Sequence, residues 1–350
     1  MAVTAAEDPT PVSEADSAAL APPGTVPAVV DGTRLPVIDS SAYEEVSFDS
    51  AGWRLSGHLY RPPGVPAGQP TPALVMAGPM TSVKEETLPH YAAPLAGAGF
   101  TVLVFDNRNF GGSDGPRRQH LDTYEQVEDL KNAVSFLLTR ADVDPERVGL
   151  ACVCLGAGYG LEVAALDRRV RAAALVAGGY DISDTYLGML GPDGFAHYVG
   201  NLGVQRQQHY ATGEQQWIPA VAPPPAYGPS SMPVREAYEY YTTAHEREAP
   251  AWQNRLTSES METLVGWNVL GHAHLVTQPL IVVHGTTDPL LLPRYAQQVY
   301  DEASSVEKQL AWVRTHNHVE LYDQDPYVGQ ALAAVVPFLT THLTPSGASS

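Results

Sequence analysis

The amino-acid sequence predicts an α/β fold, a doubly wound and mostly parallel sheet with an inserted helical cap. Continuous apolar runs alternate with amphipathic segments along most of the chain, and one such run passes straight into a glycine-rich helix start at residues 148–160. A long interval without a strand pattern separates two of these runs. Strands that alternate with helices favour a parallel sheet covered on both faces, with polar sites at the carboxyl ends of the strands.

Two patterns predict the strands. Residues 43–50 and 53–61, separated by Ala51-Gly52, indicate a β-hairpin. The buried strands of a parallel sheet have unbroken apolar runs. Such runs lie at 72–78, 100–106, 148–153, 171–178, 279–285 and 308–314.

Helices are predicted between and after these strands. Residues 88–99 have helical spacing and end on glycine, a residue that commonly terminates helices. Residues 122–141 form a clear amphipathic pattern, and 326–343 form the closing helix. The α/β core is therefore expected to comprise residues 41–180 and 276–343.

The remaining segments are a cap and two ends. Residues 181–275 are too many for an ordinary connection and are predicted to fold as a helical cap, divided by the proline-rich stretch 219–233. Residues 1–40 and 344–350 lack periodicity and are predicted to be flexible. The aromatic residues of the cap either line a substrate pocket or form its own core. They are Tyr186, Tyr198, Tyr210, Trp217, Tyr227, Tyr238, Tyr240, Tyr241, Trp252 and Trp267.

Composition excludes several classes of partner. A formal net charge of -19 disfavours nucleic acid, whose phosphates are bound by excess Lys and Arg. No apolar run reaches the length of about 20 residues that a membrane span needs. The N-terminus has no basic segment followed by an apolar one, so it is not predicted to be a secretory signal. Two cysteines make no disulfide framework, and a cytoplasmic location is expected.

Cys154 is the candidate nucleophile. It stands where the strand 148–153 meets the small residues that open a helix. Such a turn holds the nucleophile in a strained conformation above the sheet edge, and the helix N-terminus favours a thiolate. The alternative is a buried structural cysteine, which is the interpretation preferred for Cys152.

Around this turn the chain resembles the dienelactone-hydrolase-like branch of the α/β-hydrolases, in which Cys replaces the usual nucleophilic Ser. The resemblance covers about residues 43–343. It rests on VCLGAGYG (153–160), PMTSVKEET (79–87), LVFDNRNFGGSDGPRR (103–118), EAYEYYTTAHERE (236–248) and HVELYD (318–323), which occur in the family's order.

The order of nucleophile, acid and base in this fold selects the other candidate catalytic residues. Asp288 follows the strand 279–285, and His318 follows the last strand. His318 would serve as base and acid, oriented by Asp288. His316 is the second choice for the base, and the alternative role of Asp288 is a turn residue before proline.

The oxyanion hole requires two N–H donors. Leu155, the residue after the nucleophile, supplies one, and by resemblance Met80 supplies the other because Pro79 has no N–H. Two positions depart from the family pattern. Cys152 stands where the first glycine is expected, and the loop Gly78-Pro79-Met80 lacks the common His-Gly pair.

Three functions follow from these features. The first is hydrolysis or acyl transfer on an activated ester, lactone or thioester in secondary metabolism, through a Cys154 thioester. The second is a non-hydrolytic tailoring reaction, such as cyclisation, conjugate addition or carbon–carbon bond formation on a large unsaturated substrate. The third is a binding protein with an inactive triad. No cofactor or metal is implied, the partner is a small molecule, and the resemblance admits a homodimer.

Overall fold

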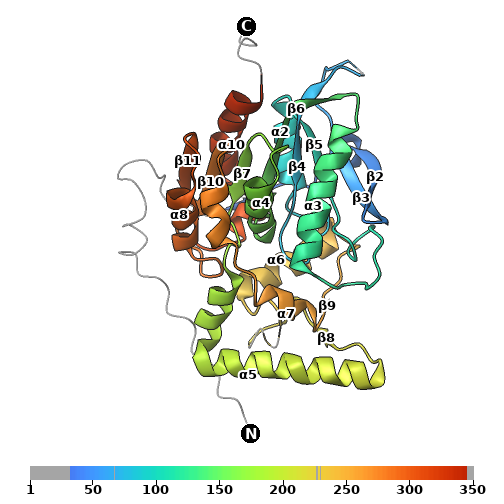
Figure 1. Cartoon of the computed structure of the whole chain (residues 1–350), viewed down its shortest axis with the longest axis vertical. Helices are drawn as coiled ribbons and strands as arrows, with labels where there is room; N and C mark the ends of the chain where they lie inside the picture. Colours follow the sequence, from blue (N-terminus) through green and yellow to red (C-terminus); the bar gives the residue numbers. More distant parts are fainter. Residues whose placement is uncertain (1–31, 67, 226–227, 229, 345–350) are drawn as a thin grey trace.

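The computed structural model describes residues 32–66, 68–225, 228 and 230–344 and has the predicted α/β architecture (Figure 1). Its main sheet has the order β11-β10-β7-β6-β4-β5-β3-β2. β3 pairs antiparallel with β2 and β5, and the other neighbours are parallel, which confirms a mostly parallel sheet. The strands are β2 (Glu44–Ser50), β3 (Trp53–Tyr60), β4 (Thr71–Met76), β5 (Thr101–Phe105), β6 (Val143–Val153), β7 (Ala173–Val176), β10 (Leu280–Gly285) and β11 (Lys308–Val313).

Helices cover both faces of this sheet, which is why its central strands are apolar throughout. On one face α2 (Pro89–Gly97) packs beside α10 (Tyr327–Leu343). On the other face lie α3 (Thr123–Leu138), α4 (Leu155–Leu166) and α8 (Pro293–Glu302). All residues of β4, β5, β7 and β10 are buried between these two layers.

Local sequence accounts for the element ends. The hairpin turn has positive φ at Ala51 (52°) and Gly52 (85°), as a two-residue connection between right-twisted strands requires. Helix α3 begins after Asp122, whose carboxylate accepts hydrogen bonds from the backbone N–H groups of Tyr124 and Glu125.

The segment between β7 and β10 lies at one end of the sheet (Figure 1). It contains α5 (Ile182–Thr212), β8 (Trp217–Ile218), α6 (Arg235–Arg247), β9 (Leu256–Thr257), α7 (Ser260–Leu264) and the 3₁₀ helix η2 (Leu270–Leu275). α5 kinks at Gly191, where φ is 68° and Pro192 follows. The segment is mostly helical, but β8 and β9 add a small antiparallel pair that the sequence did not predict.

The chain contacts the core earlier than the predicted boundary at residue 40. β1 (Thr33–Arg34) pairs with β12 (Gln324–Asp325), and the Arg34 guanidinium lies 2.9 Å from the carboxylate of Asp323. Residues 1–31 of the predicted extension and residues 345–350 of the predicted tail lie outside the described residues.

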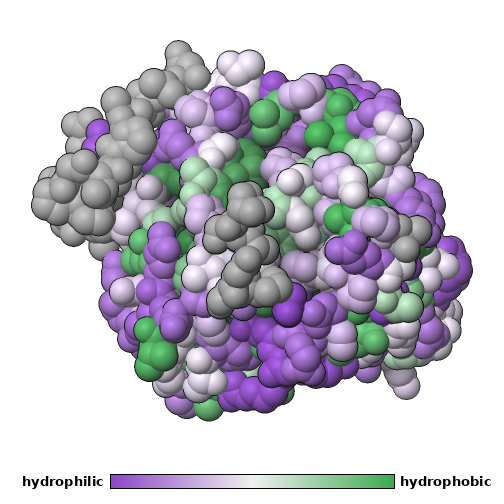
Figure 2. All heavy atoms as spheres, turned by 90° about the horizontal axis from the view of Figure 1, so that it is seen from above, coloured by the Kyte–Doolittle hydropathy of each residue, from purple (hydrophilic) through white to green (hydrophobic). Residues whose placement is uncertain are grey.

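The end of the molecule opposite α5 carries polar residues over much of its rim, with apolar residues interspersed (Figure 2). Within the described part of the chain, no helix has the length and the apolar composition needed to cross a membrane.

Candidate active site

Cys154 occupies a sharp turn between β6 and α4. Its φ of 57° and ψ of -127° are unusual for a residue with a side chain and cost about 1–3 kcal/mol. Hydrogen bonds hold the turn on both sides: the Cys154 N–H donates to the Val176 carbonyl, and its own carbonyl accepts from the Gly179 N–H, each at 2.9 Å. The side chain is thereby fixed at the carboxyl end of the sheet.

Two glycines after Cys154 allow backbone segments to approach closely. A Cβ at Gly156 would lie 2.2 Å from the Ala77 carbonyl oxygen, and one at Gly158 would lie 2.3 Å from the Gly179 oxygen. Both contacts are with backbone atoms, so a larger residue would force the start of α4 away from its neighbours.

Cys152 occupies the position where the family pattern has glycine, and Gly160 makes room for it. A Cβ at Gly160 would lie 3.1 Å from the Cys152 sulfur, so the cysteine side chain fills space that a larger helix residue would take. Burial raises the pKa of the Cys152 thiol to about 12, which keeps it neutral. The extra bulk of Cys152 is therefore accommodated by the missing side chain of Gly160 on α4.

The structure brings the three predicted catalytic side chains together, although they come from three distant segments. His318 Nε2 lies 3.3 Å from Cys154 Sγ, and His318 Nδ1 lies 2.6 Å from Asp288 Oδ2. Cys154 is 6% exposed, Asp288 1% and His318 fully buried. Bulk water therefore does not screen the interactions among them.

The Asp288 carboxylate accepts three hydrogen bonds and has a second histidine nearby. The backbone N–H groups of Leu290 and Leu291 donate to Oδ1 at 3.0 and 2.7 Å. The other oxygen, Oδ2, faces His318 and also lies 3.3 Å from Nε2 of His284. The same Nε2 atom of His284 lies 2.8 Å from the Leu291 carbonyl oxygen. This arrangement fixes which oxygen faces the imidazole of His318.

The charges of Asp288 and His318 stabilise each other. Burial opposes ionisation of both groups, but the opposite charge outweighs it. The pKa of Asp288 falls well below its usual range because of His318 and His284. The pKa of His318 rises well above its usual range because of Asp288 and Cys154. The carboxylate therefore stabilises the imidazolium that forms when His318 takes up a proton at Nε2.

Sequence reasoning missed two members of this cluster. The Tyr322 hydroxyl lies 2.9 Å from His318 Nε2. Nε2 of His284 lies 3.3 Å from Asp288 Oδ2, the oxygen that also faces His318. Each lies four residues from the group it contacts, which is the signal that could have identified it. His316 bonds to Glu320 at 2.8 Å instead, so the second choice for the base does not contact Cys154.

The predicted oxyanion residues flank the cysteine. Leu155 is the first residue of α4, so its N–H has no acceptor within the helix. The loop that contains Met80 is tied to the elbow by a 2.9 Å hydrogen bond from the Gly156 N–H to the Gly78 carbonyl. The Tyr241 hydroxyl donates to the Met80 carbonyl at 2.6 Å. Helix α6 thus helps to hold this loop.

A small apolar cavity of about 40 Å³ lies against the cysteine. From the core it is lined by Cys154, Leu155, Met80 and Leu290–Leu291, and the segment between β7 and β10 covers it. The residues of that segment in the lining are Ile182, Thr185, Tyr186, Met189, Ser231 and Met232.

Most aromatic residues of this segment pack elsewhere. Tyr186 lines the cavity, whereas Tyr240, Tyr241, Trp252 and Trp267 are buried among other rings and the backbone. Tyr210 and Trp217 are exposed, and Tyr227 lies outside the described residues. Each of the four buried rings contacts the α/β core, for example Tyr240 against Tyr322 and Trp267 against Tyr159, so these rings join the segment to the core instead of lining the cavity.

The loop after β5 braces the oxyanion loop. The Asp106 carboxylate accepts hydrogen bonds from the Lys84 backbone N–H at 2.7 Å and from the Gly112 N–H at 2.8 Å. The Ser113 hydroxyl donates to the Asp106 carbonyl, and Arg108 pairs with Asp129. These residues hold neighbouring loops in place.

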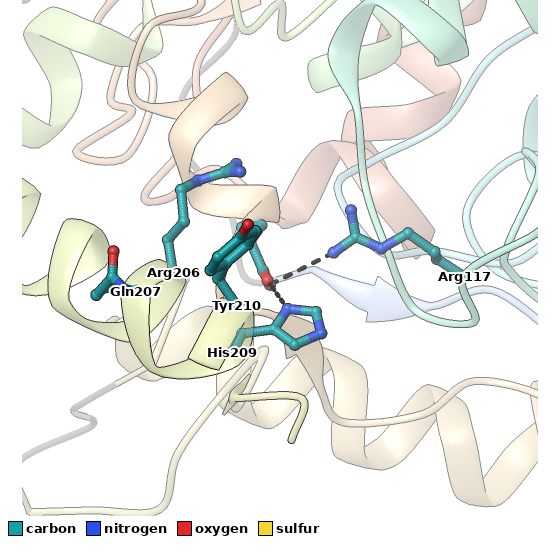
Figure 3. Close-up of a pocket in the computed structure, with 6 residues that line it drawn as sticks. Arg117, Arg206, Gln207, His209 and Tyr210 are labelled. Atoms are coloured by element: carbon teal, nitrogen blue, oxygen red, sulfur yellow. Dashed lines mark hydrogen bonds and ion pairs between the residues drawn. The ribbon is translucent and has the colours of Figure 1, made fainter. Parts of the chain in front are cut away.

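A larger cavity of about 530 Å³ shares no lining residue with the first. Arg117 and His209 both pair with the carboxylate of Glu259. Dashed lines in Figure 3 mark these two contacts from the labelled Arg117 and His209 side chains. Burial opposes the charge, but hydrogen bonds from His209 and Gln215 lower the pKa of Glu259 to about 2. Arg206 pairs with Glu262. The charges are thus matched within the cluster, which joins the end of α5 to the core.

Sequence relatives include an uncharacterized protein, a polyketide transferase and a thiohydrolase. The chain is 29% identical over 81% of its length to the uncharacterized protein YcjY of Escherichia coli, covering 93% of that protein. It is 27% identical over 79% of its length to the polyketide transferase claH of Penicillium crustosum, covering 91% of it. It is 40% identical to the thiohydrolase aneE of Aspergillus aculeatus, over 38% of this chain and 41% of aneE.

Solved structures and a family model agree on the fold. PA2218 of Pseudomonas aeruginosa superposes with a TM-score of 0.73 at 25% identity, covering 88% of this chain and 96% of that one. The α/β hydrolase GrgF of Penicillium superposes with a TM-score of 0.72 at 24% sequence identity, covering 86% of this chain and 99% of that one. The model of the X-Pro dipeptidyl-peptidase (S15) family matches residues 51–320. The chain therefore belongs to the X-Pro dipeptidyl-peptidase (S15) family, among the enzymes of the α/β-hydrolase fold.

Proposed function

We propose that Cys154, His318 and Asp288 form a catalytic triad that transfers an acyl group through a Cys154 thioester. The observation that carries this proposal is the continuous contact from Sγ to Nε2 at 3.3 Å and from Nδ1 to the carboxylate at 2.6 Å. The turn at Cys154 has the strained backbone of a nucleophile elbow. This chemistry matches the cysteine-dependent, dienelactone-hydrolase-like branch that the sequence resembles.

The chemical steps follow from the positions of the protons. Asp288 keeps a proton on Nδ1, so the neutral imidazole accepts the thiol proton at Nε2. The thiolate then attacks the carbonyl carbon, and the N–H groups of Met80 and Leu155 stabilise the developing oxyanion. Nε2–H returns its proton to the leaving group as the thioester forms. A second nucleophile then releases the acyl group and restores the thiolate.

An activated ester, lactone or thioester is the proposed substrate class. A thiolate attacks acyl groups with good leaving groups readily, and the apolar lining next to Cys154 suits a hydrocarbon-rich acyl chain. Methionines at positions 80, 189 and 232 can adapt to chains of different shape. The relatives named thiohydrolase and polyketide transferase support acyl chains from secondary metabolism.

A second candidate function uses the same thioester to form a new bond with an acceptor other than water. The apolar cavity and the relatives named polyketide transferases favour it. In this reaction the acceptor carbon or heteroatom attacks the thioester, and the carbon–sulfur bond breaks to regenerate Cys154.

Rapid mixing with activated esters and thioesters of several chain lengths tests both functions. A covalent intermediate predicts a burst of about one leaving group per protein, followed by slower turnover. Product analysis with added alcohol, thiol and carbon-acid acceptors then separates hydrolysis from transfer. Tight ligand binding without a burst or turnover would contradict the proposal and support a binding protein.

A further inference from the structure

The Tyr322 hydroxyl shares the reactive nitrogen of His318 with the cysteine. It lies 2.9 Å from Nε2, whereas Cys154 Sγ lies 3.3 Å from the same atom. The cysteine, the imidazole and the phenol therefore form a three-membered cluster in which one nitrogen faces two partners.

Packing fixes the phenol in this position. Tyr322 is 2% exposed, and its ring meets the Tyr240 ring edge-on at 4.9 Å and the His318 ring at 5.1 Å. Tyr240 is itself anchored, because the Thr87 side chain and backbone N–H bond to its hydroxyl at 2.7 and 3.0 Å. The hydroxyl of Tyr322 therefore cannot turn away from Nε2 without disturbing these rings.

The number of protons on the imidazole limits what Nε2 can do. Nδ1 donates to Asp288, so neutral His318 has one lone pair, located on Nε2. Before acylation, both the thiol and the phenol can donate to this lone pair. After acylation the sulfur has no proton, and the phenol remains as the donor next to Nε2.

Resting on the proposed function, we infer that Tyr322 protects the acyl-enzyme from water and sets the choice of acceptor. Water needs Nε2 to accept its proton as its oxygen attacks the thioester and the carbon–sulfur bond breaks. The phenol occupies that lone pair and must be displaced first. An acceptor that arrives as an anion, such as a thiolate or a stabilised carbanion, needs no proton acceptor and is not slowed.

The test is the lifetime of the acyl-enzyme in wild type and Tyr322→Phe, which keeps the ring and removes the hydroxyl. Each protein is acylated with an activated ester, and the adduct is followed by intact mass in buffer alone and with a small thiol. Because one hydrogen bond is lost, decay in buffer is expected to accelerate about three- to tenfold. Decay by thiol should change less than about twofold, so the ratio of transfer to hydrolysis falls.

Matched variants separate this role from a structural one. Tyr60→Phe also loses a buried tyrosine hydroxyl, from β3, but Tyr60 contacts neither Nε2 nor Tyr322, so the ratio of transfer to hydrolysis in this variant is expected to equal that of wild type. Tyr322→Leu should change the ratio in the same direction as Tyr322→Phe. Tyr322→Leu therefore tests the same inference if the Tyr322→Phe protein does not fold.

The outcomes distinguish this inference from the proposed function. Unchanged decay of the Tyr322→Phe adduct in buffer overturns the inference alone, and slower decay overturns it in favour of a proton relay through the phenol. If wild type forms no adduct, the proposed function fails and the inference fails with it.

Discussion

Asp288→Asn is expected to lower kcat/KM for activated esters by about 10³- to 10⁴-fold while the protein remains folded. The backbone N–H groups of Leu290 and Leu291 bond to one side-chain oxygen of residue 288. They will hold the amide oxygen of Asn there, which turns its NH₂ group toward His318. Nδ1 must then accept a hydrogen bond, so the proton moves to Nε2. An imidazole with Nε2 protonated cannot accept the thiol proton.

Steady-state kinetics together with thermal unfolding check this expectation. The matched variant is Asp288→Glu, which keeps the charge but displaces the carboxylate, so it should retain more activity than Asn. Activity of Asp288→Asn within about tenfold of wild type would show that the tautomer of His318 does not control the reaction.

Gly156→Ala is expected to destabilise the protein by about 3 kcal/mol or more. Its Cβ would lie 2.2 Å from the Ala77 carbonyl oxygen and 2.7 Å from the Gly78 nitrogen. Both are backbone atoms of the segment that leads to the oxyanion loop, so neither can move without breaking the bond from the Gly156 N–H to the Gly78 carbonyl. Activity should fall together with stability because the same movement displaces Met80.

Denaturant unfolding of Gly156→Ala and Gly200→Ala measures this effect. Gly200 lies in α5 with nothing within 4 Å of its missing Cβ, so alanine there should stabilise the helix by about 1 kcal/mol or less. Equal unfolding midpoints for Gly156→Ala and wild type would refute the close approach of α4 to Ala77 and Gly78 in the segment after β4.

Much of the fold could be predicted because its signals are local. The apolar runs that became β4, β5, β7 and β10 are buried on both faces, and a strand of that kind has no polar positions to obscure it. The small antiparallel pair β8 and β9 was not predicted, since two residues per strand leave no periodicity.

The candidate site was predictable to the extent that it follows strand ends. Cys154 comes directly after β6, and Asp288 and His318 lie in the loops that follow β10 and β11. Parallel strands bring these ends together. The contact of Cys152 with Gly160 could not be predicted, because it depends on which side of α4 faces β6. Tyr322 was part of a quoted motif, but its distance to Nε2 requires the three-dimensional path of the chain after β11.

Locating the acyl group on a single sulfur tests the central claim most directly. Wild type, Cys154→Ala and Cys152→Ala are mixed with an activated thioester, quenched in acid, and analysed by intact mass and by fragmentation of the peptide that contains both cysteines. The account predicts one acyl group on Cys154 in wild type and in Cys152→Ala, and none in Cys154→Ala. An acyl group on Cys152, or full turnover by Cys154→Ala, would contradict it.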